Sequence, residues 1–470
     1  MTGKSQAEFY YYFTEMIICH SQLVAVYGVG EYNLLEFKME IHIYYHESLP
    51  AVSHNWECLP LIDFGIRLLN TVPSKRLNLA YLPETEVIAL SVLDCNASRK
   101  FQQNLRITNE EWNLAISPLQ IIRGLAVLYE LADGKCKIKL GNLISKALFG
   151  EIIPFGKTIH EYLNDLCTIY LRSLPKGAIQ IYFEENHLLK FDKELMEYID
   201  KYYGAGPQES EMTERDSEER TKKEVVQTMC FQMNPNGQTL VDKMNKNIKE
   251  ATEGTTEYVV RRDLSPKQGT RLAMVTSFNS TFYWRPPDRI MEVEMFFYET
   301  YEKITHTRSV IKGYRCDGSF RTCVTRDGVR VLELDSEIDN FKMYLFQPRM
   351  LFSKDFLKSL NARKLKHYIS QIDNRSTRQS VIIPRFSIIS PIGLRSVFSS
   401  CNPFCHFIFK NKHPQFPYPC IARIFSPDKA EFGKIYGKAA QKNYGSFHIY
   451  PLWNYYHKTK MIVSLNSSLN

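Results

Sequence analysis

Cysteine and histidine side chains gather most densely in one short stretch of the chain. Cys401, Cys405, His406 and His413 lie close together in the sequence. Thiolates and imidazoles are common zinc ligands, but a zinc site needs a spacing that produces a tetrahedron. Cys405 and His406 are adjacent, so in a strand their side chains would point to opposite faces. We therefore expect free thiols here, with no bound metal and no cofactor.

No other arrangement of residues predicts catalysis. His20, His42, His160 and His306 stand in unrelated contexts, and the chain has no G-x-S-x-G nucleophile motif. We predict that the protein is not an enzyme. The eleven cysteines are irregularly spaced, and the odd count without a Cys-x-x-Cys pair does not indicate a disulfide framework.

Composition is typical of an ordinary globular protein. The chain has 470 residues, with 44% hydrophobic residues, 23% charged residues and a formal net charge of +8. No block of lysine and arginine is dense enough to indicate a nucleic-acid-binding surface. No run of eighteen uncharged apolar residues is present, so we expect no transmembrane helix and no membrane partner. The first thirty residues lack a clean cleavage site and make a poor signal peptide.

Hydrophobic spacing predicts helices first and strands later. Helices are expected at 61–70, 118–132, 157–172, 192–204, 238–252 and 353–370, and the one at 118–132 should begin with Ser117 as cap and Pro118 in its first turn. Strands are expected at 178–186 and 271–284, and then repeatedly from 291 to 348, ending in a hairpin at 331–348. A further strand is expected at 381–389. Because no regular alternation of strand and helix appears, the pattern favours an α+β fold.

One segment resembles a known family. In "NLAISPLQIIRGLAVLYELADGKCKIKLGNLI" (113–144), Asn113, the Ser117-Pro118 step and Ala132-Asp133-Gly134 match a pattern found in serpins. Leu131 departs from the pattern, since it stands where the family has a glycine.

Further segments resemble serpin motifs in the same order along the chain. They are "VDKMNKNIKEATEG" (241–254) with Asn245, Thr252 and Gly254, "RLAMVTSFNSTFYW" (271–284) with Thr276 and Trp284, the hairpin ending in Pro348, "VIIPRFSI" (381–388) with Pro384 and Phe386, and "NPFCHFIFKNKHPQFPYPCIARIFSP" (402–427) with Pro403, Phe404, Arg423 and Pro427. The last segment resembles the family's closing pair of strands. The resemblance covers about 61–70 and 110–427, so the domain is expected at 61–429, with 71–108 as an insertion and 205–223 as a mobile charged loop. Residues 1–60 are then an unmatched N-terminal extension, and 430–470 an unmatched C-terminal tail.

The resemblance implies a fold with helices around a large mixed central sheet and smaller sheets. It also implies inhibition of serine-type endopeptidases by a bait loop that inserts into that sheet after cleavage. In the family, a helix, a central strand and the bait loop lie between the segments matched here by Phe386 and Asn402, which only fifteen residues separate. We therefore interpret 387–401 as a truncated junction and expect the central sheet to be incomplete and the bait loop to be absent. The reactive bond is unknown, and the chain as written is predicted to be non-inhibitory.

A buried polar cluster under the central strands is also implied by the resemblance. Ser117 matches it, whereas Gln120 stands at a family serine and Thr276 at the family asparagine. The family histidine would fall in the missing strand, so we expect this cluster to be relaxed.

Several consequences follow for partners and location. A serine or cysteine protease is the partner if a loop exists in the true product. The open position beside 271–280 predicts a strand-addition partner or self-association.

The alternatives to inhibition are a binding, carrier or scaffold protein and a non-functional truncated paralogue. The family favours an extracellular location, and Asn96, Asn279 and Asn374 begin glycosylation triplets, while the poor signal peptide and odd cysteine count favour the cytoplasm.

Overall fold

A five-stranded sheet runs through the middle of the molecule. In the computed structural model its strands lie in the order β14 (Phe386–Gly393), β15 (Leu452–Leu465), β8 (Leu272–Trp284), β6 (Gly177–Glu184) and β7 (Val226–Met229). β15 is parallel to β8 and antiparallel to β14, and β6 is antiparallel to β8 and parallel to β7. The sheet is therefore mixed, and its two central strands come from distant parts of the chain.

The structure describes only part of the chain. The described residues are 11–19, 22–30, 37–38, 43–46, 59–76, 114–152, 159–163, 177–184, 192–203, 225–229, 238–260, 271–284, 289–299, 307–335, 341–347, 359–372, 376–399, 418–426, 429–432, 434 and 452–465.

A second sheet contains ten strands. Their order is β11 (Arg330–Asp335), β12 (Phe341–Gln347), β4 (Ile43–His46), β1 (Tyr11–Cys19), β2 (Gln22–Gly30), β9 (Arg289–Glu299), β10 (Thr307–Val324), β13 (Thr377–Pro384) and β3 (Phe37–Lys38), with β5 (Leu114–Ile116) paired to β2. The long β10 also pairs with β11, so part of this sheet closes on itself. The strands between residues 11 and 46 thus belong to the sheet, although residues 1–60 were predicted to be an unmatched extension.

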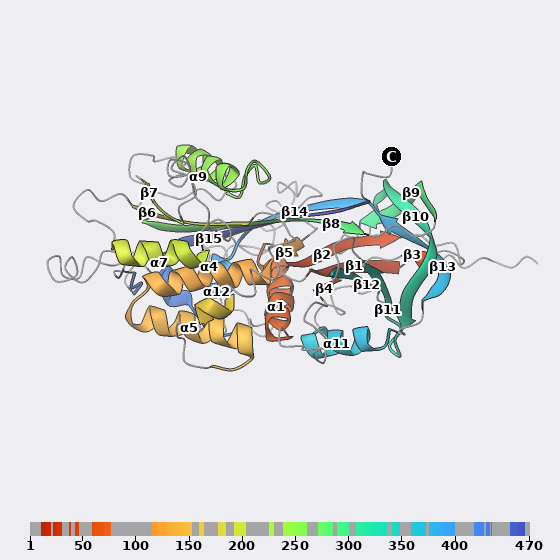
Figure 1. Cartoon of the computed structure of the whole chain (residues 1–470), viewed down its shortest axis with the longest axis horizontal. Coiled ribbons are helices and arrows are strands. Elements are labelled where there is room, and N and C mark those ends of the chain that lie inside the picture. Colours follow the sequence, from red (N-terminus) through yellow and green to blue (C-terminus); the bar gives the residue numbers. More distant parts are fainter. Residues whose placement is uncertain are drawn as a thin grey trace, which may run out of the picture.

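Helices cover both faces of the five-stranded sheet (Figure 1). α9 (Gln238–Ala251) lies on one face, and α4 (Pro118–Leu131), α5 (Gly134–Phe149) and α7 (Lys193–Tyr203) lie on the other. α1 (Leu59–Arg76) and α12 (Arg395–Ser399) also lie on the α4 side, and α11 (Ala362–Ser370) lies near the ten-stranded sheet. A short 3-10 helix, η4, spans Ala422–Phe425.

The strand β8 is buried on both faces. Leu272 and Met274 pack into the large core with α4, whereas Ala273 and Val275 pack into a smaller core with α9. A strand that is covered on both sides has a nearly continuous run of apolar residues, and this explains the sequence of the first half of β8. β15 follows the same alternation, since Tyr455 faces the α4 core and Tyr456 faces the α9 core.

The α+β class predicted from the sequence is confirmed, as are most predicted elements. The predicted strand at 381–389 is different, because the chain divides it at the exposed Arg385 into β13 and β14, which belong to different sheets. The two strand-like runs of the sequence at 309–318 and 319–328 are joined in one strand, β10, which ends at Val324. The helix α1 continues to Arg76, beyond the predicted end at residue 70.

The expectation of an incomplete central sheet was wrong. β15 lies between β8 and β14 and pairs with β8 from Leu452 to Leu465, so the position beside residues 272–284 is filled. The error arose because residues after 430 were treated as a tail outside the fold. Residues 387–393 belong to β14, and residues 395–399 form α12.

The prediction of a closing strand pair at 402–427 was wrong in the part that is described. Ala422 to Phe425 form the 3-10 helix η4, in which Arg423 lies. Residues 402–413 and 427 lie outside the described residues, as do most of the predicted insertion at 71–108 and the charged loop at 205–223. None of the described helices is both long enough and apolar enough to cross a bilayer.

Candidate functional site

The site begins with the capped N-terminus of α4. Ser117 is extended, and its hydroxyl accepts a hydrogen bond from the Gln120 N–H at 3.3 Å, while Pro118 occupies the first turn. This is the arrangement that the Ser-Pro step predicted, because a capping oxygen satisfies an N–H that has no partner within the helix. The cap places the backbone of Ser117 directly against β15.

His457 on β15 joins this cap to β8. The backbone N–H of Ser117 lies 3.2 Å from His457 Nε2, and Thr459 Oγ1 lies 2.9 Å from the same nitrogen. A backbone N–H can only donate, so Nε2 must be the acceptor and Nδ1 must carry the hydrogen. Nδ1 lies 2.9 Å from Thr276 Oγ1 on β8, to which it donates. The neutral ring therefore satisfies both of its nitrogens.

Burial keeps this histidine neutral. The His457 side chain is fully buried, and burial lowers its pKa to about 3 because the charged ring would lose its hydration. A proton on Nε2 would also point at the N–H of Ser117, and the hydrogen bond between them would be lost. The cluster can therefore hold β15 to β8 only while the imidazole is uncharged.

Gln120 ties β8 to its other neighbour. Its Nε2 donates to the carbonyl oxygens of Ala178 on β6 and Ser277 on β8, both at 3.1 Å. Its Oε1 accepts from Arg123 Nη1 at 3.1 Å. The prediction that Gln120 and Thr276 mark a relaxed cluster was wrong, because both side chains make cross-strand hydrogen bonds.

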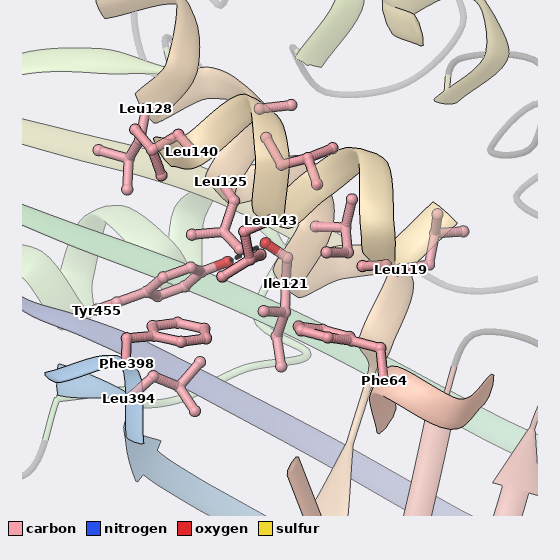
Figure 2. Packing of buried hydrophobic residues seen from close by; sticks show 14 of the residues in the cluster. Phe64, Leu119, Ile121, Leu125, Leu128, Leu140, Leu143, Leu394, Phe398 and Tyr455 are labelled. Atoms are coloured by element: carbon pink, nitrogen blue, oxygen red, sulfur yellow. Dashed lines mark hydrogen bonds between the residues drawn. The ribbon is translucent and has the colours of Figure 1, made fainter. Parts of the chain in front are cut away.

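Tyr455 anchors β15 to the body of α4 (Figure 2). Its hydroxyl donates to the carbonyl oxygen of Ile121 at 2.9 Å, and its ring packs near Phe398. A Cβ on Gly124 would lie 2.2 Å from the Tyr455 hydroxyl oxygen. Glycine is therefore needed at this point of α4 for the tyrosine to approach.

The opposite face of the sheet is held by the segment that follows α9. Asn245 accepts from the N–H groups of Val259 and Val260 at 2.8 and 2.9 Å, so it fixes the returning chain. Thr252 accepts from the Thr256 N–H at 3.1 Å, and Gly254 has a φ of 80°, in the left-handed region that favours glycine. The predicted residues Asn245, Thr252 and Gly254 thus shape one turn.

That turn is bonded to the sheet by Asn279 and Lys458. Asn279 Nδ2 donates to the hydroxyl oxygens of Thr255 and Thr256, both at 2.7 Å. The buried Lys458 ammonium lies 3.5 Å from the centre of the Tyr258 ring. Asn279 is 6% exposed, so in the folded protein its amide is not accessible to glycosylation.

The remaining predicted residues do not join this site or cannot be placed. Trp284 is buried at the end of β8, and Pro384 and Phe386 lie at the end of β13 and the start of β14. Asn113, Pro348, Pro403 and Phe404 lie outside the described residues, as does the cluster of Cys401, Cys405, His406 and His413. Among the described residues, no group of histidine, cysteine and carboxylate side chains is placed to hold a metal ion.

Sequence reasoning missed His457, which is the centre of the site. The available signal was the alternating stretch "LWNYYHKTKMIVSL", which has the length and residue types of a buried strand. It was overlooked because the strand pairs with residues almost two hundred positions earlier.

Comparison with known proteins is consistent with the predicted resemblance. A family model described as Serpin (serine protease inhibitor) matches residues 94–413, which is more than half of the chain. The chain is a serpin. The match ends before β15, so residues 452–465 are placed in the serpin fold by the structure alone.

Solved structures show the same fold in other serpins. A structure of a tumour-suppressing serpin has a TM-score of 0.53 at 14% identity, covering 87% of this chain and 89% of that one. Uncleaved ovalbumin has a TM-score of 0.53 at 15% identity, with 74% and 82% covered, and native protease nexin-1 with heparin has 0.55 at 15% identity, with 87% of each chain covered. At these identities the likeness concerns the fold alone. No curated protein matches the chain in sequence.

Proposed function

We propose that the activity of this serpin is inhibition of serine-type endopeptidases, with the bait loop leaving the C-terminal end of β15. The observation that carries this proposal is the position of His457. In serpins, the histidine of the buried polar cluster lies in the central strand that leads into the loop. His457 lies on β15, and it is bonded to Thr276 on β8 and to the backbone of Ser117. We therefore assign β15 as that strand.

This assignment moves the expected loop. The loop was expected between Phe386 and Asn402, but the strand that should precede it ends at Leu465. Bait residues would then follow Leu465. A bait loop that inserts into this sheet must be long enough to run along the 14-residue β15, because a strand advances about 3.3 Å per residue.

The test compares residues 1–470 with the same chain extended beyond Leu465 by about 25 small residues that include one arginine. The two proteins are incubated with trypsin and run on a denaturing gel. We expect a covalent complex that survives denaturation for the extended chain alone, since an acyl-enzyme forms only at a cleavable bond held in the protease's active site. Cleavage of the extension without a stable complex, in a chain that still melts cooperatively, would contradict the proposal.

The alternative of a carrier or scaffold protein depended on an open groove beside β8. β15 fills that position, so this argument no longer supports the alternative. The same applies to a strand-addition partner and to self-association through that edge.

A further inference from the structure

A segment between α12 and β15 is fastened across the helices of the α4 side. We call residues 418–426, 429–432 and 434 the strap. Its apolar side chains are buried in the large core: Tyr418, Ile421, Ile424, Phe425, Ala430 and Phe432. The strap is the last described segment before β15.

The strap supplies the cap that α5 lacks. Asp133 stands at the N-cap position, but its side chain makes no capping hydrogen bond, and the first turn of α5 contains no acidic residue. Glu431 of the strap replaces it, because its Oε2 accepts from the Cys136 N–H at 3.2 Å, while its backbone oxygen accepts from the Asp133 N–H at 2.9 Å. A Cβ on Gly134 would lie 2.7 Å from the same carboxylate, so glycine is needed for this approach.

Two ion pairs complete the attachment. Glu431 Oε1 lies 2.8 Å from Arg423 Nη2, so the carboxylate that caps α5 also holds η4. Lys434 Nζ lies 2.9 Å from Glu130 Oε2 at the end of α4. The other oxygen of Glu130 lies 2.9 Å from His160 Nε2, so the strap is connected to a buried part of the helical layer.

The strap is connected to β15 through Arg395. The Arg395 guanidinium lies 5.9 Å from the centre of the Phe425 ring in η4 and 5.1 Å from that of Trp453 in β15. Its Nη1 donates to the Trp453 carbonyl oxygen at 3.0 Å, and its backbone N–H donates to Asn454 Oδ1 at 3.1 Å. Arg395 therefore contacts the strap and the first residues of β15 simultaneously.

We propose that the strap is a latch: Glu431 at the N-terminus of α5 holds η4, and η4, through Arg395, holds the N-terminal end of β15 in the central sheet. Release of Glu431 from α5 then loosens residues 452–458 as well as α5, although Glu431 touches no residue of that strand in the contacts described. This latch acts on the folded chain without a protease, so it does not depend on the proposed inhibition.

Hydrogen exchange measured on residues 1–470 tests the latch. In Glu431→Ala, we expect amide exchange to rise about tenfold both in residues 134–140 and in residues 452–458, in line with the loss of a helix cap. Asn361→Ala is the matched control. It removes the cap of α11, where Asn361 Oδ1 accepts from the Lys364 N–H at 2.9 Å, and should raise exchange in α11 while residues 452–458 keep the parent rate. An increase in Glu431→Ala confined to residues 134–140 would overturn the proposal.

A double variant tests the connection through Arg395. Arg395→Lys keeps the charge but loses the planar group that stacks between two rings. On this background, Glu431→Ala should change exchange in residues 452–458 by less than about threefold, because the path is already broken. If Glu431→Ala still raises amide exchange in residues 452–458 tenfold on this background, the two substitutions act independently and the route through Arg395 is excluded.

If Glu431→Ala does not fold, Glu431→Gln replaces it. This variant keeps one acceptor oxygen and should give a smaller rise in exchange in both segments. A rise in residues 134–140 alone would again overturn the latch.

Discussion

The two faces of the β8 and β15 pair are held by different chemistry. On the α4 face, the neutral His457 ring bonds to the Ser117 backbone and to Thr276, and all of these groups are buried. On the α9 face, Asn279 bonds two hydroxyl groups and Lys458 lies against a tyrosine ring. The α4 face fixes the strands themselves, whereas the α9 face fixes a turn that lies on top of them.

This difference predicts that damage to the α4 face is global and damage to the α9 face is local. Loss of the His457 ring would leave buried polar groups on α4, β8 and β15 without this partner, whereas loss of the Asn279 amide affects the hydroxyl groups of one turn. The experiments below follow the expected size of the effect.

The largest effect is expected for His457→Leu. The substitution keeps a side chain of similar bulk but leaves the Ser117 N–H and the Thr459 hydroxyl without this buried partner, each costing about 1–3 kcal/mol. Thr276 loses its bond to the ring but can still donate to the Tyr456 carbonyl oxygen at 3.4 Å. Urea unfolding should show a loss of roughly 3 kcal/mol or more in the free energy of unfolding. His367→Leu, at an exposed histidine of α11, is the control and should change little. If His457→Leu lowers the free energy of unfolding by less than about 1 kcal/mol, the cluster contributes little to stability.

Gly124→Ala should follow in size. The added methyl group would lie 2.2 Å from the Tyr455 hydroxyl oxygen, so α4 and β15 must separate at a cost of about 1–3 kcal/mol. Thermal unfolding of Gly124→Ala, and of the double variant with Tyr455→Phe, measures how much stability this steric contact costs. Removal of the hydroxyl should recover part of the lost stability, and a double variant that is less stable than Gly124→Ala would refute the steric explanation.

Mild acid should weaken the α4 face through His457. The pKa of this ring is about 3 in the folded protein and about 6.5 when unfolded, so the unfolded chain binds the proton first. Stability from this group is complete above pH 6.5 and is lost as the pH falls toward 3, by up to about 1.4 kcal/mol per pH unit. Urea unfolding between pH 7 and 5 should show this slope, and His457→Leu should flatten it; an equal slope in both proteins would mean that another group titrates.

The smallest effect is expected for Asn279→Ala on the α9 face. It removes two hydrogen bonds to Thr255 and Thr256, and about 1 kcal/mol of stability. Hydrogen exchange should rise in residues 252–260 while β15 keeps its protection. Equal acceleration in β15 would mean that the two faces act as one unit, and the contrast between them would not hold.

Local sequence determined many elements and one part of the site. The Ser117-Pro118 step predicted the start of α4, apolar spacing predicted α7 and α9, and the apolar run predicted β8 as a buried central strand. These signals are local, because a helix cap or a buried face depends on residues within a few positions of each other. Ser117, Gln120 and Thr276 could therefore be named as neighbours only through the resemblance to serpins.

Tertiary structure alone decided which strands are neighbours. β15 lies beside β8 although nearly two hundred residues separate them, and Arg385 divides one apolar run between two sheets. Strand pairing is made by backbone hydrogen bonds that carry little sequence information, and the partner is selected by burial of side chains from the whole chain. His457 could be recognised as the centre of the site only once β15 was in place, because its partners on α4 and β8 come from distant parts of the sequence.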